Sequence, residues 1–266
     1  MKYFDFHTHA FVDALAERAV GSLADTSGII PATDGTLSGL KKVMAEHNIG
    51  RAMILPVATK PSQQTNINNW AAEIMDGSIF CCGSVHPDAD DAVAEVERIA
   101  SLGLCGLKFH SEYQHFRPDE ERIMPVCRKA AELGLFVVFH GGWDPLSGED
   151  ILAKPRCFAH LAERLPELTV VVAHMGGIEL FDEAEDCLAG RFEHLYLDTG
   201  VVADYISDEQ FCRLVEKQGA DKVLFGSDCP WDHPEKEIAM IDALPLSEAE
   251  KELIFYKNAE KLVGKR

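Results

Sequence analysis

Basic side chains are scarce in this sequence. Its 266 residues include 25 Lys and Arg against 44 Asp and Glu, so the formal net charge at pH 7 is −19. A chain this acidic is repelled by nucleic acid and by anionic membrane surfaces, so neither is expected as a partner. The remaining composition, with 47% hydrophobic and 26% charged residues, is typical of a folded globular chain and excludes wholesale disorder.

Long apolar runs and paired cysteines are absent as well. The longest apolar run, Leu168 to Ile178, is interrupted by His174 and falls far short of a membrane span. The N-terminus enters a strand-like segment without the apolar stretch of a targeting signal. The eight cysteines are scattered and form no Cys-x-x-Cys motif, which is typical of reduced thiols and excludes a zinc ribbon. These features predict a cytoplasmic protein.

Short apolar segments alternate with helical patterns along the chain. Several segments are continuous runs of Val, Ile, Leu and Phe, as expected for parallel strands covered on both faces. The eight predicted strands are Tyr3–Phe6, Ala52–Val57, Ile79–Val85, Gly106–Phe109, Leu135–Phe139, Thr169–Ala173, Leu195–Leu197 and Lys222–Phe225. Eight strand–helix units in about 250 residues predict a (β/α)8 TIM barrel that forms a single domain over residues 1–266. A doubly wound open sheet uses the same units and is the alternative.

Helix signals lie between these predicted strands. One helix face is predicted from apolar residues at the spacing i, i+3, i+4, i+7, namely Ile123, Val126, Cys127 and Ala130. Two capping boxes predict helix starts, at Ser207-x-x-Gln210 and Ser247-x-x-Glu250.

The first connection, from Ala10 to Gly50, is longer than the others. It contains two helical stretches around the segment Gly21–Thr36, which is rich in Gly, Ser, Thr and Asp and is expected to form a loop. Because this segment follows a strand that ends in histidines, we expect it to be mobile without ligand and to close over the barrel mouth.

Histidine and aspartate residues stand at the ends of several predicted strands. His7 and His9 are two residues apart, so they point to the same side of the first strand and can reach one metal ion. For this pair alone, two partly buried histidines satisfied by the backbone are the favoured explanation. His140, His174 and Asp228 end later strands, however, and the strand ends of a barrel converge on one mouth. Five such residues at one mouth predict a site for a divalent metal ion.

Other residues near the predicted strand ends are candidates for substrate contact. Lys108 and His110 share a face of the fourth strand, where Lys108 could meet a substrate carboxylate or form an ion pair within the barrel. His86 could line the mouth or serve as a structural histidine before a turn. Trp143 and Trp231 follow the fifth and eighth strands and could either wall the pocket or pack in the core.

Asp198 and Cys229 also lie just after predicted strands. Asp198 follows the seventh strand and could orient a ligand or cap Thr199–Gly200. Cys229 lies beside Asp228, but no base is assigned to it, so it is expected to be a small buried thiol rather than a nucleophile.

Six motifs are spread over nearly the whole chain: Asp5–His9, Gly106-Leu107-Lys108-Phe109-His110, Phe139-His140, Ala173-His174-Met175-Gly176-Gly177, Gly226-Ser227-Asp228-Cys229-Pro230-Trp231 and Lys257-Asn258-Ala259-Glu260-Lys261-Leu262. In these motifs the sequence resembles the amidohydrolase superfamily, within it the amidohydrolase-related branch that includes aminocarboxymuconate-semialdehyde decarboxylase. The resemblance implies a metal-dependent (β/α)8 barrel with His7, His9, His140 and Asp228 as ligands. It also implies a catalytic or second-metal role for His174.

The resemblance bears on the number and kind of metal ions. In two-metal relatives a lysine at the end of the fourth strand is carboxylated and bridges the metals, and Lys108 has that position. The Lys108-Phe109-His110 pattern of this branch goes with a mononuclear site instead, so one divalent ion is expected. Nitrogen and oxygen ligands accept zinc, manganese, iron or cobalt, and zinc is the expected ion.

The expected chemistry follows from such an ion, which lowers the pKa of its water to roughly 7. Asp228 would contact the metal and accept the proton of this water, while His174 would polarise a carbonyl or stabilise developing negative charge. The leading hypothesis is hydrolysis of an amide, ester or lactone in a small, carboxylated molecule. A non-oxidative decarboxylase on the same site is the second hypothesis, and a barrel that binds metal or ligand without catalysis is the third. The sequence leaves the oligomeric state open, with a homo-oligomer as one possibility.

Overall fold

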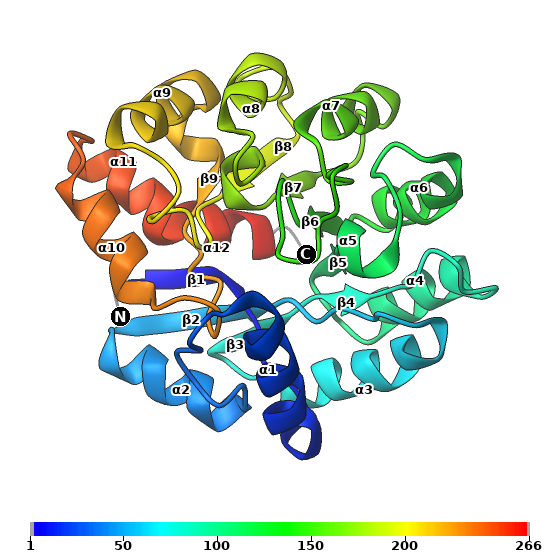
Figure 1. Ribbon diagram of the computed structural model, residues 1–266. Coiled ribbons are helices and arrows are strands. Elements are labelled where there is room, and N and C mark those ends of the chain that lie inside the picture. The colour runs from blue at the N-terminus through cyan, green and yellow to red at the C-terminus, as the bar shows by residue number, and fades with distance from the viewer. Residues whose placement is uncertain (1–2, 265–266) are drawn as a thin grey trace.

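The computed structural model describes residues 3–264 and shows a ring of parallel strands surrounded by helices (Figure 1). The strands are β1 (Tyr3–Thr8), β2 (Ile49–Ile54), β3 (Ile79–Cys81), β4 (Gly83–Ser84), β5 (Gly106–Phe109), β6 (Phe136–Phe139), β7 (Val170–Val172), β8 (Leu195–Asp198) and β9 (Val223–Leu224). Every pairing between neighbouring strands is parallel. β3 and β4 are separated only by Cys82, so together they correspond to the third of the eight predicted strands.

Backbone hydrogen bonds close the strands into a barrel. The N–H of Phe6 on β1 donates to the carbonyl of Phe225 just after β9 at 2.7 Å, and the N–H of Asp228 donates to the carbonyl of His7 at 2.8 Å. The N–H of Cys82 donates to Ile54 O at 3.0 Å, which links the β3–β4 strand to β2. The predicted (β/α)8 barrel is therefore confirmed, and the open sheet is excluded.

Helices cover the outside of this barrel. They are α1 (Asp13–Ser27), α2 (Leu37–Glu46), α3 (Gln64–Ile74), α4 (Ala92–Ser101), α5 (Ser111–Gln114), α6 (Met124–Glu132), α7 (Pro155–Arg164), α8 (Phe181–Cys187), α9 (Asp208–Gln218), α10 (Pro234–Ala243), α11 (Glu248–Glu252) and α12 (Asn258–Val263), with short 3₁₀ turns at Pro61–Gln63, Glu121–Ile123, His174–Gly176 and Ala220–Lys222 and a π-helical turn at Leu253–Lys257. No helix in residues 3–264 is long and apolar enough to cross a membrane.

The predicted helix signals are confirmed with one exception. The four apolar residues of the predicted face, Ile123 to Ala130, are buried. Ser247 and Glu250 form a complete capping box at the start of α11. Ser207 caps α9 by accepting from the N–H of Gln210, but the Gln210 side chain donates to Asp182 instead of returning to Ser207, so the second capping box is wrong in that half.

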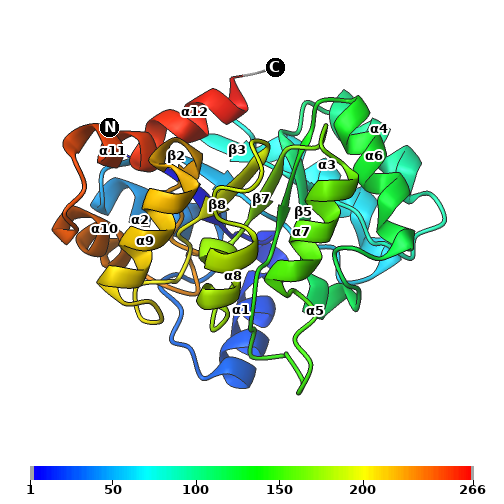
Figure 2. The same ribbon diagram turned by 90° about the horizontal axis from the view of Figure 1, so that it is seen from above.

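Apolar side chains fill the interior of the barrel toward one of its ends. A cluster of buried side chains that includes Phe4, Phe6 and Val138 lies inside the strands, and Leu262 of α12 packs against it. Figure 2 shows α12 at one end of the barrel and α1 at the opposite end. With one end closed by apolar packing, polar residues at the carboxyl ends of the strands are gathered at the other end, where barrel enzymes carry out their chemistry.

The long first connection differs from its prediction. α1 continues to Ser27, so the first part of the predicted loop Gly21–Thr36 is helical, and the loop begins at Gly28. Gly28 has φ +73 and its N–H donates to Ala24 O, which is the usual left-handed end of a helix and needs glycine. The loop then returns to the barrel mouth, because the N–H of Ala32 donates to Pro230 O at 2.8 Å.

Candidate active site

Three of the four predicted metal ligands meet at the mouth of the barrel. Oδ1 of Asp228, in the turn after β9, lies 3.1 Å from Nε2 of His7 and 3.0 Å from Nε2 of His9. The side chains of His7, His9 and Asp228 are 1%, 13% and 11% exposed. Their donor atoms all lie within 4.8 Å of one another, a spacing that suits one bound ion.

The protonation of His9 follows from its second ring nitrogen. His9 Nδ1 lies 2.8 Å from the carbonyl oxygen of Leu55, and a carbonyl can only accept a hydrogen bond. Nδ1 of neutral His9 therefore carries the proton, and Nε2 presents a lone pair to the carboxylate of Asp228. Two acceptors 3.0 Å apart repel each other unless a cation lies between them, so this contact fits a metal ion or an additional proton.

His7 is fixed in the same way by a carboxylate. Its Nδ1 lies 3.0 Å from Oδ2 of Asp198, which is fully buried, while its Nε2 faces Asp228. Metal-binding histidines usually donate their other N–H to a carboxylate or carbonyl in this manner. Asp198 also accepts from the N–H groups of His174 (3.1 Å) and Gly200 (3.0 Å) through Oδ1. Asp198 thus caps the backbone at Gly200, as one of its two predicted roles requires, and also fixes the ring of His7.

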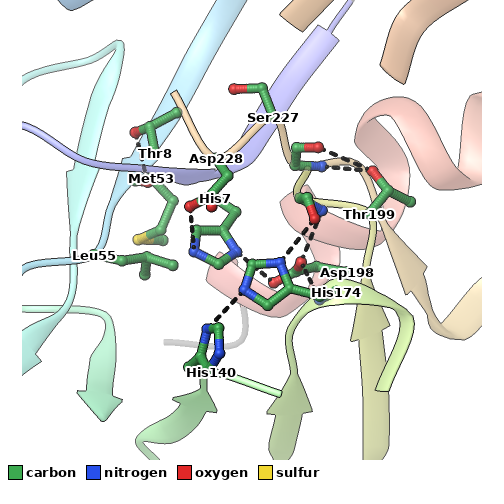
Figure 3. Close-up of polar contacts among 12 residues, drawn as sticks. His7, Thr8, Met53, Leu55, His140, His174, Asp198, Thr199, Ser227 and Asp228 are labelled. Carbon is green, nitrogen blue, oxygen red and sulfur yellow. Dashed lines mark hydrogen bonds and ion pairs between the residues drawn. The ribbon is translucent and has the colours of Figure 1, made fainter. Parts of the chain in front are cut away.

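His140 and His174 form a second chain of contacts (Figure 3). His174 Nδ1 lies 2.7 Å from Gly200 O, so it is the donor, and Nε2 of His174 is free to accept from Nδ1 of His140 at 3.0 Å. Nε2 of His140 then carries a lone pair, and this buried atom has no hydrogen-bond partner within residues 3–264. The structure therefore links His140 to the other ligands through His174 rather than directly.

The donor set fits a divalent metal ion. His7, His9 and His140 each present an unprotonated Nε2, and Asp228 adds a carboxylate. Burial is the main cause that lowers the pKa of His7 and of His140, which favours the neutral imidazoles that bind metals. Burial raises the pKa of Asp228, whereas positive charge at His7 and His9 lowers it and prevails, so a cation beside these groups favours the ionised carboxylate. His7, His9 and Asp228 lie close enough together to hold one divalent ion, and the imidazole and carboxylate donors suit such an ion.

Lys108 lies deeper than a residue of the pocket rim. Its side chain projects from β5, is 1% exposed as a residue, and places Nζ 3.2 Å from Nε2 of His7. Burial lowers the pKa of Lys108, whereas Asp198 and Asp228 oppose this shift. The structure thus puts Lys108 against a predicted metal ligand.

The other four predicted substrate-binding residues have different surroundings. His110 is buried and its ring stacks on that of His140, so it adjoins the candidate ligands. Nδ1 of His86 accepts from the N–H of Asp88 at 3.2 Å, a turn contact that does not bring this histidine to the ligands. Trp143 and Trp231 are both partly buried. Trp231 lies three residues after Asp228, and the centroid of its ring is 6.4 Å from that of Phe11.

Two residues near the ligands were not predicted as functional residues. Asp5 accepts from the N–H (2.9 Å) and the hydroxyl (2.6 Å) of Ser227, and so ties β1 to the segment that carries Asp228. Burial raises the pKa of Asp5 to about 7. Asp144 lies 3.4 Å from the ring of His110. Asp5 belongs to the motif that ends in His9, but no spacing in the sequence points to Asp144.

Comparison with known proteins gives the wider context. No curated protein matches the chain significantly. Similar solved structures include an uncharacterised TIM-barrel protein from Bordetella bronchiseptica (21% identity, 99% of both chains covered, TM-score 0.83). Another is a probable 2-pyrone-4,6-dicarboxylic acid hydrolase from Acinetobacter baumannii with citric acid bound (17% identity, 99% and 100% covered, TM-score 0.72). A third is a 5-carboxyvanillate decarboxylase from Novosphingobium aromaticivorans with bound manganese (17% identity, 98% and 97% covered, TM-score 0.70).

These structural likenesses support the barrel fold, and a family model gives the membership. The model described as amidohydrolase matches residues 5–265, from the first strand to the end of the last helix. Its match confirms the resemblance found in the strand-end motifs. The chain therefore belongs to the amidohydrolase family of metal-dependent enzymes.

Proposed function

We propose that this enzyme hydrolyses an amide, ester or lactone bond in a small, carboxylated molecule, with zinc as its metal ion. The observation that carries the proposal is the carboxylate of Asp228 held 3.0–3.1 Å from the unprotonated nitrogens of His9 and His7. A divalent ion held there supplies Lewis-acid polarisation and activates water. The likeness to a probable dicarboxylic acid hydrolase supports a carboxylated substrate.

The chain's own residues would divide the proton transfers between them. Asp228 is ionised and lies at the mouth, so it is placed to accept a proton from the attacking water and pass it to the leaving group. His174 donates from Nδ1 to Gly200 O, so its Nε2 is a base; after taking up a proton there, His174 would donate to developing negative charge. Lys108, whose ammonium group lies at the floor of the site, would attract the carboxylate of the substrate.

Non-oxidative decarboxylation is the second candidate. It is favoured by the deep burial of the site, because a buried site removes water from the substrate carboxylate and so destabilises this group relative to CO₂. His7, His140 and His174 are between 1% and 5% exposed. The likeness to a 5-carboxyvanillate decarboxylase supports this candidate as well.

One experiment separates the two reactions. The purified protein, loaded with zinc or with manganese, is incubated with panels of lactones, amides and aromatic acids, and the release of acid and of CO₂ is measured side by side. Acid release without CO₂ is expected for the hydrolase, and CO₂ release would favour the decarboxylase. Full metal loading with no turnover in any panel would count against both and favour a barrel that only binds.

A further inference from the structure

Asp144 and Tyr113, which take no part in the proposed reaction, enclose His110 beside the candidate ligands. Nε2 of His110 lies 3.4 Å from Oδ2 of Asp144. The His110 ring is nearly parallel to the rings of Tyr113 (centroids 3.8 Å apart, 4° between planes) and His140 (4.1 Å, 12°). Two rings this close and parallel must lie on opposite faces of His110. The imidazole plane is therefore fixed by a three-ring stack.

The position of His110 in the chain places this three-ring stack beside the candidate active site. His110 follows Lys108 by two residues and so shares its inward face, and Lys108 contacts the predicted ligand His7. The N–H of His110 is held by the side chain of Gln114 at 3.0 Å, and the Gln114 amide donates in turn to two backbone carbonyls. The backbone that carries His110 is thus anchored.

Judged by distance alone, the cluster of His110, His140 and Asp144 could bind a metal ion. Donor atoms of His110, His140 and Asp144 lie within 4.8 Å of one another. An imidazole lone pair lies in the plane of its ring, however, and the planes of His110 and His140 are nearly parallel and about one ring thickness apart. Their lone pairs cannot meet at one ion about 2.0–2.1 Å from each nitrogen. The cluster therefore does not fit a second metal ion.

The carboxylate of Asp144 decides which nitrogen of His110 carries the proton. Oδ1 of Asp144 accepts from the N–H of Leu146 at 2.8 Å, and the Asp144 N–H donates to Ser147 Oγ at 3.0 Å, so the carboxylate is held in a turn. Oδ2 then faces Nε2 of His110. A lone pair on Nε2 would repel this oxygen, whereas a proton there is attracted to it, so the Nε2–H tautomer is favoured.

Nδ1 of His110 is consequently an acceptor in need of a donor. It is buried and has no hydrogen-bond partner within residues 3–264. A buried acceptor without a partner is costly, and a ligand that supplies a hydrogen-bond donor recovers that cost.

We infer that Asp144 and His110 form a specificity pair, in which Asp144 keeps the proton on Nε2 and the free Nδ1 of His110 selects substrates that carry a hydroxyl or amino hydrogen. This inference rests on the proposed function for the carboxylate of the substrate. It adds a second recognition element to that substrate, a hydrogen-bond donor. Asp144 acts as a positioning residue, because its effect passes through His110.

The tautomer is tested directly by nitrogen NMR of the zinc-loaded protein labelled with ¹⁵N-histidine, with His110→Gln to assign the signal. The wild-type protein should show His110 protonated on Nε2 and not on Nδ1. Asp144→Asn keeps an oxygen for the Leu146 N–H but places an amide against Nε2, so the proton should move to Nδ1. Asp119→Asn is the matched control, since Asp119 pairs with the exposed His160 at 3.1 Å and should leave His110 unchanged.

Binding of a matched ligand series supplies the second readout. Benzoate and the three monohydroxybenzoates are titrated into the wild-type protein and the two variants. At least one hydroxybenzoate should bind the wild type and Asp119→Asn roughly tenfold more tightly than benzoate does, the effect of one net hydrogen bond. Asp144→Asn should lose this preference while keeping its zinc.

The outcomes separate the inference from the proposed function. A wild-type His110 protonated on Nδ1, or an Asp144→Asn variant with unchanged tautomer and unchanged preference, would overturn the inference. The wild-type spectrum decides the tautomer even if Asp144→Asn does not fold. Failure of every acid in the series to bind would count against a carboxylated substrate, and the spectrum would still decide the pair.

Discussion

His174 lies between two predicted metal ligands, His7 and His140, but its contacts do not require it to be a ligand itself. Its ring centroid is 5.0 Å from that of His7 and 4.7 Å from that of His140, and both of its nitrogens have protein partners. A residue in this position can act on the substrate or fix the tautomer of His140. The two roles differ in what the resting enzyme loses when the imidazole is removed.

His174→Asn tests the catalytic role. If His174 stabilises charge or moves a proton, the variant should keep a full complement of metal and lose turnover by ~10²–10⁴-fold. Metal content and kcat are measured on the same preparation, with His140→Ala as the control that should lose metal as well. A variant that retains wild-type kcat with metal bound would show that neither charge nor proton passes through His174.

Glu237 on α10 is a buried carboxyl group away from the ligands. Its Oε1 accepts from the N–H of Ala203 at 3.3 Å, and its Oε2 has no partner within residues 3–264. Burial, reinforced by Asp232, raises the pKa of Glu237 from 4.5 to about 9. The folded state therefore holds a proton that the unfolded chain releases between these two values. The stability from this group is present below pH 4.5 and is lost as the pH rises toward 9.

Glu237→Gln should remove this dependence, because the amide resembles the protonated acid and keeps the acceptor for Ala203. Between pH 5 and 8 the free energy of unfolding of the variant should gain on the wild type by about 1.4 kcal/mol per pH unit. Urea unfolding at several pH values measures the difference, with the exposed Glu163→Gln as control. A constant difference between the two proteins across this range would contradict the assignment.

Among the elements, the first connection is the one that we expect to control access to the mouth. The loop after α1 is attached to the mouth through Ala32, and Phe11 before α1 contacts Trp231. Between these attachments Leu15 and Ile30 are 57% and 86% exposed. Closure over a bound substrate would bury them.

Shortening the loop over residues 28–31 should therefore change KM or the range of substrates while metal content stays the same. Leu133→Ser, which removes an exposed apolar side chain elsewhere in the chain, is the control and should leave KM unchanged. Steady-state kinetics with the substrate found in the panels provides the measurement. Unchanged kinetics in the shortened protein would show that the connection is a surface excursion without a role in access.

The elements also show where sequence reasoning succeeds and where it stops. Continuous apolar runs such as Leu135–Phe139 identify parallel strands because both of their faces are buried. The end of α1 was missed because glycine and serine in Gly21–Ser27 suggested a loop, whereas the helix is continued by the alanine and leucine residues among them. The local composition alone does not show whether the glycine and serine residues or the alanine and leucine residues determine the structure of such a segment.

At the scale of the whole molecule, the barrel turns residues far apart in the sequence into one site. Its closure brings Asp228 against His7 and His9, so the meeting of these three side chains could be predicted from the strand ends alone. Which nitrogen of each histidine is free could not be predicted, because it depends on partners such as Leu55 O and Asp198 that only the fold supplies. Asp144 was missed for the same reason.

We propose that His7, His9, His140 and Asp228 hold one catalytic divalent ion, and metal analysis of the purified protein is the decisive experiment. Elemental analysis should find one divalent ion per chain, and His140→Ala and Asp228→Asn should lose it while circular dichroism confirms that they are folded. Chelation should abolish activity, and added zinc or manganese should restore it. Full activity in protein shown to be free of metal would contradict the claim.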